Sequence, residues 1–402
     1  MDFTIATSFL ENILKINDFA TSTEYEKYLN YWPLFLIGFL GSLLLVPIFG
    51  YVAKKFKITY IPGKGRNGKK FDNPEKAIHD VETPALGGLA ITIPILIAIL
   101  LLFRLDAMTI PIALALTVLI VGSLLDDILN LPSKAQLLYQ FIAASIIAFS
   151  IIDLTNISFF SEDLLNLTSY TWSTNILSIP ISFVFPGDLI LIAWILLCIN
   201  SVKWVGGSPG LIESYSLVIF LLLFIIGVRT FSLFSSSISI LIAGGLIPLL
   251  FFAYPSPKVM SGSSGKSVYG FLISILALIA GLKFSATIML LAIPLFDAIY
   301  VIIYRAFTYK PKNLIELMKI NDTSHLHHRL LKLNLSGKKV LLLETSISLV
   351  IGSFAILATG AYRYFIMIFS IAFVLAFIVF IHYCANRKGK EKKKSPESKY
   401  SY

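Results

Sequence analysis

Residues 108–127 read MTIPIALALTVLIVGSLLDD, an apolar run that ends in two adjacent aspartates. An α-helix needs a run of about 20 apolar residues to cross a lipid bilayer. The whole chain shares this character, since 56% of its 402 residues are hydrophobic and 14% are charged. Because a soluble domain has about a quarter charged residues, the composition indicates a membrane protein.

Similar apolar blocks recur along the chain and predict an all-α polytopic membrane protein with about 10–11 transmembrane helices. The expected spans are 33–53, 86–103, 108–125, 135–152, 181–199, 211–228, 235–253, 267–282, 284–304, 341–360 and 364–384. We divide the chain into an N-terminal interfacial segment (1–32), a transmembrane domain (33–385) and a disordered basic tail (386–402). The stretch 154–187 is expected to be a polar external loop.

Positive charge is distributed unevenly between the loops. If the N-terminus lies outside, 27 of the 33 lysines and arginines fall on the cytoplasmic side and 6 on the other. This bias predicts a multi-pass protein of the cell membrane with its C-terminus in the cytoplasm. It also accounts for the formal charge of +10 without nucleic acid as a partner. Cys198 and Cys384 suggest no disulfide framework.

Asp126 and Asp127 end the third span, and Lys134 follows them. Acids near a helix C-terminus oppose the helix dipole, so they do not stabilise the end of their own helix. Two adjacent acids at a membrane boundary suit a divalent cation or a proton acceptor. The alternative is a pair of solvated residues at a helix end.

Two small-residue loops lie on the same predicted side. Residues 200–211 read NSVKWVGGSPGL, and exposed amides at a helix start favour an anion such as phosphate, although an ordinary turn has the same composition. Residues 257–267 read PKVMSGSSGKS, which ends like a P-loop. Met260 stands where a P-loop needs glycine, so we exclude that motif. A lysine in such a loop can still hold a phosphate.

Two further polar features lie in the last third of the chain. Asp297 lies within a span, where an acid is costly and by default functional. Residues 323–330 read TSHLHHRL and hold three of the five histidines, His325, His327 and His328. Imidazoles bind metals or phosphate, and on a helix His325 and His328 would share a face. A metal-only site is less favoured, because no Cys or Glu lies at the usual ligand spacing.

In this order, the motifs resemble the polyprenyl-phosphate N-acetylhexosamine-1-phosphate transferases of glycosyltransferase family 4. That family starts lipid-linked cell-wall and surface polysaccharide synthesis, and the resemblance covers about residues 33–385. The segments that carry it are Thr83-Pro84 with Gly87-Gly88-Leu89, Asp126-Asp127 with Lys134, Asn200, Pro294-Leu295-Phe296-Asp297, and Asp322 with His325-Leu326-His327-His328-Arg329-Leu330.

The resemblance implies a phosphoglycosyl transferase that moves an N-acetylhexosamine 1-phosphate from a UDP-sugar to a polyprenyl phosphate such as undecaprenyl phosphate and releases UMP. It implies Mg²⁺ as cofactor, held by Asp126 and Asp127. The implied catalytic residues are Asp126, Asp127, Asp297, His325, His327 and His328, and the implied substrate-binding residues are Lys134, Asn200, Lys203, Lys266 and Arg329. A homodimer is compatible with the sequence.

Departures from the family pattern leave alternatives open. Gly206, Pro209 and Ser263 stand where the family has acids, while Lys203 and Lys266 are additional cations. One interpretation is a transferase that uses fewer metal ligands, with the lysines replacing part of the cation. Another is a catalytically altered paralogue that binds polyprenyl phosphate or regulates a partner. A transporter is less favoured, because the two halves show no internal repeat.

One further acid lies beside the altered glycine-rich loop. Glu213 lies two residues after the end of that loop. It is interpreted as a relocated metal ligand or, more simply, as an acid of the first helical turn, where the helix dipole favours it.

Overall fold

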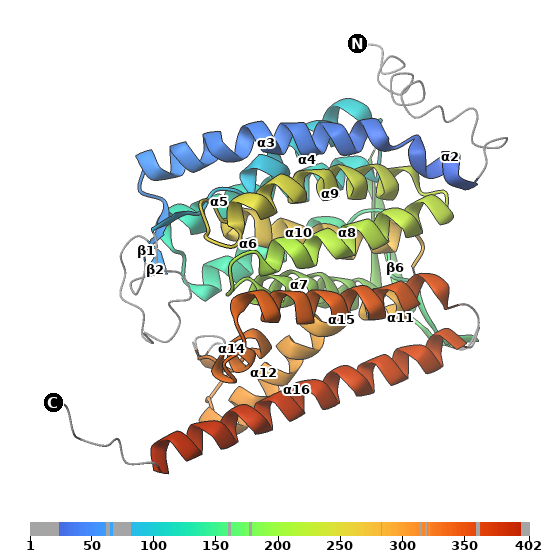
Figure 1. Ribbon diagram of the computed structural model, residues 1–402. Coiled ribbons are helices and arrows are strands. Elements are labelled where there is room, and N and C mark those ends of the chain that lie inside the picture. The colour runs from blue at the N-terminus through green and yellow to red at the C-terminus, as the bar shows by residue number, and fades with distance from the viewer. Residues whose placement is uncertain are drawn as a thin grey trace.

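The computed structural model describes residues 24–61, 65–66, 82–159, 162–176, 179–282, 284–313, 316–317, 320, 322–358 and 362–394. These residues form a bundle of long, roughly aligned helices with α3 and α16 along opposite edges (Figure 1). Most of the predicted interfacial segment, residues 1–23, and the end of the tail, 395–402, lie outside the described residues.

Eleven longer helices build the described part of the bundle. They are α3 (Trp32–Lys55), α4 (Leu89–Leu102), α5 (Thr109–Leu129), α6 (Ser133–Ala148), α7 (Gly187–Val205), α8 (Leu211–Arg229), α9 (Leu233–Ala253), α10 (Gly262–Ile279), α12 (Ala292–Tyr309), α15 (Gly337–Leu357) and α16 (Tyr362–Lys394). Three short helices are α2 (Glu24–Leu29), α11 (Phe284–Leu290) and α14 (Leu326–Lys332).

The helices confirm an all-α polytopic membrane fold. Nine described helices are long and apolar enough to cross a membrane, and α4 is a shorter apolar helix. The span predicted at 284–304 is divided into α11 and α12 at Leu291. Pro294 lies just after this break and cannot donate the backbone hydrogen bond that would continue α11.

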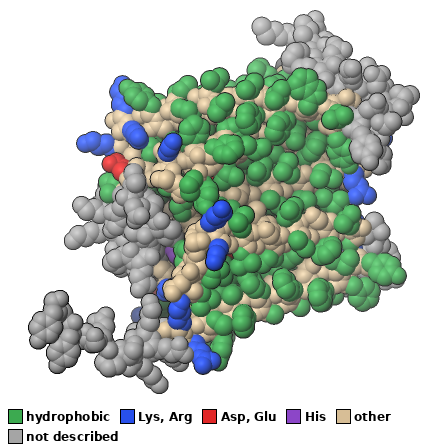
Figure 2. Space-filling view, viewed as in Figure 1, with side chains coloured by type: hydrophobic (Ala, Val, Ile, Leu, Met, Phe, Trp, Pro, Cys, Tyr) green, Lys and Arg blue, Asp and Glu red, His purple; other side chains and the backbone are tan. Residues whose placement is uncertain are grey.

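One end of the bundle is basic. The helix α3 ends there, α5 ends and α10 begins there, and α16 extends past it to Lys394. Lysine and arginine side chains gather at this end, on the left of Figure 2, whereas hydrophobic side chains cover the flank. We call it the basic end; by the charge bias it faces the cytoplasm. The tail was predicted to be disordered from residue 386, but it is helical as far as Lys394.

Small antiparallel β-elements cap the two ends. The segment predicted as an external loop forms two hairpins instead, β4 (Asn156–Phe159) with β5 (Glu162–Asn166) and β6 (Thr168–Ile176) with β7 (Ile179–Pro186). The alternating aromatic and β-branched residues of β6 favour a strand. At the basic end, β1 (Thr59–Ile61) pairs with β2 (Gly65–Arg66) and β3 (Thr83–Pro84).

Helix α10 lies at the centre of the bundle, and 89% of the residues in its membrane-spanning stretch are buried. Its start is held against the start of α4, because the Gly88 amide donates a hydrogen bond to the Ser261 carbonyl at 3.0 Å. A Cβ atom on Gly88 would lie 2.3 Å from the Gly265 backbone. The Gly87-Gly88 pair therefore allows two backbones to approach closely, as small residues do at helix-packing contacts.

We expect Gly88→Ala to destabilise the protein by roughly 1–3 kcal/mol, the usual cost of overpacking where backbone atoms must move. Thermal unfolding in detergent measures the effect as a lower melting temperature. Gly41→Ala is the matched control, because a Cβ at Gly41 meets nothing within 4 Å. Equal melting temperatures for the two variants would contradict the packing role.

Candidate functional site

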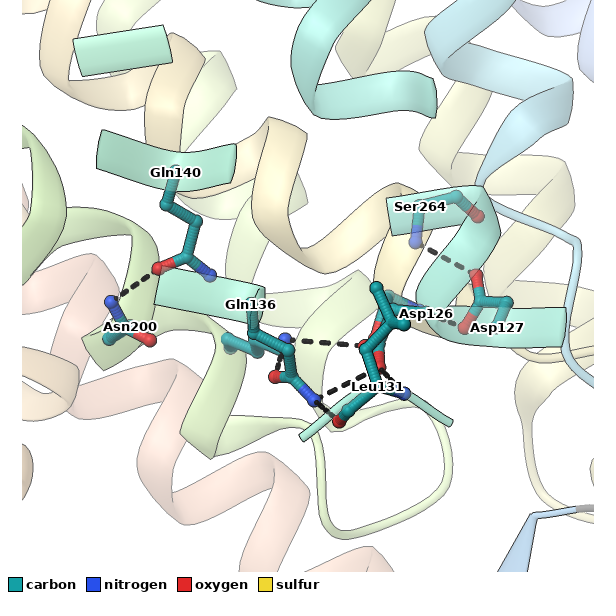
Figure 3. Close-up of polar contacts among 9 residues, drawn as sticks. Asp126, Asp127, Leu131, Gln136, Gln140, Asn200 and Ser264 are labelled. Atoms are coloured by element: carbon teal, nitrogen blue, oxygen red, sulfur yellow. Dashed lines mark hydrogen bonds and ion pairs between the residues drawn. The ribbon is translucent and has the colours of Figure 1, made fainter. Parts of the chain in front are cut away.

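Asp127 accepts hydrogen bonds from the first backbone amides of α10. The Ser263 amide donates to its Oδ1 at 2.7 Å and the Ser264 amide to its Oδ2 at 3.0 Å (Figure 3). A helix start leaves such amides unpaired, and its dipole favours a carboxylate. The sequence reasoning weighed Asp127 only against the dipole of its own helix, α5; in the structure, Asp127 caps α10.

Asp126 connects α5 to three neighbouring segments. The Ser263 hydroxyl donates to its Oδ2 at 2.6 Å, and the Leu131 amide and the Gln136 side chain donate to its Oδ1 at 3.0 and 2.9 Å (Figure 3). Lys203 of α7 lies 3.5 Å from Oδ2 and donates to Gln136 Oε1 at 2.6 Å. Gln136, which the sequence analysis did not identify, therefore links α5, α6 and α7.

One turn further along α6, Gln140 accepts a hydrogen bond from the Asn200 amide at 2.8 Å (Figure 3). The same Nδ2 group of Asn200 also donates to the Leu196 carbonyl at 2.8 Å, so two acceptors hold the NH₂ end of this side chain. Gln140 is 1% exposed. Two glutamines four residues apart in an otherwise apolar helix are a sequence signal that could have identified this face of α6.

The loop between α7 and α8 lies between Lys266 and the histidines. The Lys266 ammonium donates to the Gly206 carbonyl at 2.9 Å. A Cβ on Gly206 would lie 2.6 Å from Lys266 Nζ, and a Cβ on Gly207 would lie 2.3 Å from His327 Nε2. Both positions need glycine for this close approach. We call Asp126, Asp127 and the lysines beside them the aspartate side of the site, and Asp297 with His325, His327 and His328 the histidine side. The α7–α8 loop joins the two sides.

Asp297 organises the histidine side. Its Oδ2 lies 2.8 Å from His325 Nδ1, and its Oδ1 accepts the Leu326 amide at 2.8 Å. With a carboxylate at Nδ1, that nitrogen carries the proton, so Nε2 of His325 is left to face other partners. The rings of His325 and His327 stack at 5.9 Å, and those of His327 and His328 lie 4.3 Å apart. All three histidines are buried.

The predicted histidine loop is therefore partly helical, because α14 begins at Leu326. His325 precedes the helix as its N-cap. The expected pairing of His325 with His328 on one helix face is replaced by stacking of His325 on His327.

Arg329 contacts two other helices. Its Nη1 donates to Asn386 of α16 at 2.7 Å, and its guanidinium lies 5.6 Å from the ring of Tyr304 on α12. Arg329 thereby ties α14 to the bundle. Lys134 lies on the exposed first turn of α6.

Asp322 lies just before the histidine cluster and pairs with Arg305. The Arg305 Nη2 and Nε donate to Asp322 Oδ1 at 2.7 and 3.1 Å, and the Ser324 hydroxyl donates to the same oxygen at 2.6 Å. Burial alone would raise the pKa of Asp322, but these hydrogen bonds outweigh it and lower the pKa. Asp322 thus stays ionised and holds the turn into α14.

The structure brings most of the predicted site residues into one contact network at the basic end. They are Asp126, Asp127, Lys203, Lys266, Asp297, His325, His327 and His328, with Asn200 joined through Gln140 and the helix α6. Trp204, which the sequence analysis did not assign to the site, lies 5.7 Å from the His325 ring and joins α7 to the cluster.

The donor set does not fit a divalent cation. Mg²⁺ prefers near-octahedral oxygen ligands, yet each oxygen of Asp126 and Asp127 already accepts a hydrogen bond from the protein. Lys203 and the positive end of α10 would also repel a cation there. Glu213 accepts a hydrogen bond from the Ser261 hydroxyl at 2.5 Å. Among the described residues, no three His, Cys, Asp or Glu side chains are grouped to hold a metal.

Comparison with known proteins supports the motif-based resemblance. Residues 109–281 match the model of glycosyl transferase family 4. The chain is 24% identical over 347 residues to a "Probable undecaprenyl-phosphate N-acetylglucosaminyl 1-phosphate transferase" of Bacillus subtilis, a match that covers 84% of this chain and 87% of the relative. It is 27% identical over 330 residues to a "Phospho-N-acetylmuramoyl-pentapeptide-transferase" of Clostridium beijerinckii, covering 79% and 92%.

These matches confirm the resemblance to the phosphoglycosyl transferase family. Together with the nine apolar helices, they also confirm a multi-pass protein of the cell membrane. The family model covers the acid pair, the α7–α8 loop and the start of α10, so it spans the aspartate side of the site.

We expect Asp127→Asn to lower the free energy of unfolding by roughly 1.5–3 kcal/mol, the range for hydrogen bonds to a charged group. An asparagine places an NH₂ donor against one of the two α10 amides. Thermal unfolding in detergent measures the change, with Glu316→Gln as the control because Glu316 is exposed. A melting temperature unchanged by Asp127→Asn would show that the capping bonds do not stabilise α10.

Proposed function

We propose that the chain transfers an N-acetylhexosamine 1-phosphate from a UDP-sugar to a polyprenyl phosphate and releases UMP, at the basic end of the bundle. One observation carries the proposal: an apolar groove shares a wall with the polar site. Asn200 and Trp204 line the groove, and the same two residues contact Gln140 and His325 of the site. An apolar chain and a phosphate head group on one molecule suit this juxtaposition.

The groove lies between α7 and α12. Its volume is about 290 Å³, and its walls are almost entirely apolar. Ala193, Leu196 and Leu197 line it from α7, and Ile302 lines it from α12. Ala193 is exposed on a membrane-spanning helix, so the groove opens toward lipid. A polyprenyl chain can therefore enter from the bilayer while its phosphate reaches the basic end.

In the proposed reaction, an oxygen of the polyprenyl phosphate attacks the phosphorus that carries the sugar. The bond from this phosphorus to the bridging oxygen of UMP breaks, and UMP leaves with the electron pair. The product is a polyprenyl diphosphate sugar. Positioning and electrostatic stabilisation supply most of the catalysis in such transfers.

The site residues take the following proposed roles. His325, His327 and His328 hydrogen-bond the diphosphate, and Asp297 fixes the orientation of His325. Asp126 and Asp127 hold Lys203 and the start of α10 in place. The substrate-binding residues are Asn200, Lys203 and Lys266, joined by Lys134 and Arg329 at the edge of the site. No step passes through a metal, because the oxygens of Asp126 and Asp127 already accept hydrogen bonds from the protein.

A second candidate is a paralogue that binds polyprenyl phosphate without transferring sugar phosphate. The hydrogen bonds that already occupy the oxygens of Asp126 and Asp127 favour it, because these acids have a structural task. The groove and the histidine side would serve binding alone equally well.

Purified protein, undecaprenyl phosphate and labelled UDP-N-acetylglucosamine test the transfer directly. We expect release of UMP together with a labelled lipid product, because the proposed reaction forms the two in equal amounts. His327→Ala should abolish both, since His327 lies against the Gly207 backbone at the centre of the site. Failure across a panel of UDP-sugars, with binding of lipid phosphate intact, would refute the transferase and support the binding paralogue.

A second variant tests the groove. Ala193→Trp should fill the groove and raise the KM for polyprenyl phosphate about tenfold, equivalent to about 1.4 kcal/mol of lost binding. The affinity for the UDP-sugar should not change. Leu189→Trp is the control, because Leu189 is 49% exposed on the same helix and does not line the groove. Equal KM values for the two variants would place the lipid chain elsewhere.

A further inference from the structure

Two lysines on facing helices supply fixed positive charge inside the site. The Lys203 side chain on α7 is 13% exposed, and Lys266 on α10 is 7% exposed. Both lie at the basic end, on either side of the α7–α8 loop. An ammonium group is costly to enclose this far unless anionic or hydrogen-bonding partners offset the lost hydration.

Each lysine is held by named contacts. Lys203 donates to Gln136 Oε1 at 2.6 Å and lies 3.5 Å from Asp126, while Lys266 donates to the Gly206 carbonyl at 2.9 Å. The lysines are thus positioned before any ligand arrives, which reduces the ordering cost of binding.

The loop between the lysines brings a buried hydroxyl close to the two charged sides of the site. Gly206 and Gly207 lie against Lys266 and His327 without a Cβ between them. Ser208 in the same loop is 3% exposed, and its hydroxyl has no partner among the described residues. A buried hydroxyl without a partner calls for an explanation, and an anion held by the neighbouring lysines would supply the missing acceptor.

We infer that Lys203, Lys266 and the Ser208 hydroxyl bind the diphosphate of a nucleotide without a divalent cation. The choice of a nucleoside diphosphate as ligand rests on the proposed function. In this site, the lysines supply the positive charge that a metal would otherwise bring. Asp126 holds Lys203, and Asp127 holds the start of α10, so neither acid serves as a metal ligand.

Lysine and a metal make different demands on the protein. A divalent cation needs several oxygen ligands at fixed distances. A lysine ammonium carries its own positive charge and its own hydrogen-bond donors, so the protein needs only to supply a few acceptors that hold it in place. The chain offers the second kind of site: the two aspartates accept hydrogen bonds from amides, a hydroxyl and Gln136. The additional lysines lie in the two loops where the family pattern has lost acids.

Binding of UDP to the full-length protein in detergent tests the inference by calorimetry. With EDTA in place of Mg²⁺, we expect the Kd for UDP to change by less than about twofold, well below the tenfold change that 1.4 kcal/mol would cause. A Kd that rises about tenfold or more in EDTA and recovers with Mg²⁺ overturns the inference. Absence of UDP binding in both conditions overturns it as well.

Charge variants test the lysines themselves. Lys203→Met and Lys266→Met should each weaken UDP binding about tenfold or more, the scale of a lost charged hydrogen bond. Lys203→Arg keeps the charge and should retain binding within about threefold, which separates loss of the ligand contact from misfolding caused by an unpaired Asp126. Lys258→Met is the matched control, because Lys258 is an exposed lysine at the same end. Unchanged affinity in Lys203→Met and Lys266→Met overturns the inference.

The binding experiment and the transfer assay can fail separately. Metal-independent binding of UDP without release of UMP from any UDP-sugar supports the inference and refutes the transferase. Binding that requires Mg²⁺ overturns the inference, whether or not UMP is released in the transfer assay.

Discussion

The site depends on the contact between the Asp127 carboxylate and the buried start of α10. That helix is the most enclosed of the nine apolar helices, so water does not reach its first amides readily. The two amide hydrogen bonds from Ser263 and Ser264 supply the missing acceptors and fix α5 against α10. This contact also positions its neighbours. The Ser263 hydroxyl donates a hydrogen bond to Asp126, and Lys266 lies one turn further along α10.

The histidine side uses the same arrangement a second time. Asp297 accepts the first amide of α14 and one adjacent side chain, as Asp127 accepts the first amides of α10. In both places an acid in a membrane helix is stabilised by the start of a following helix. The α7–α8 loop closes the gap between the two sides, because glycine lets its backbone touch Lys266 and His327. One arrangement of capped helices thus produces a polar site inside an apolar bundle.

The sequence predicted most of the spans and the basic end, because apolar length and charge bias are local signals. It also singled out most of the polar residues that the structure brings into one contact network, because isolated polar groups in an apolar chain are a local signal too. It did not predict that Asp127 would cap α10, since that partner lies 136 residues away in the chain. Gln136 and Trp204 were missed because a single polar or aromatic residue in a helix is ordinary until its neighbours are known. The division of one span into α11 and α12 needed the local effect of Pro294.

If the proposed function is correct, the opening of the groove toward lipid determines which concentration matters to this protein. A ligand that enters through Ala193 and its neighbours comes from the bilayer, so its effective concentration is its mole fraction among the surrounding lipids. Diluting the membrane with other lipids would then slow encounter even when the total amount of ligand is fixed. The soluble ligand at the basic end would follow ordinary bulk concentration. Under the proposed function, the protein would thus meet one substrate in two dimensions and the other in three.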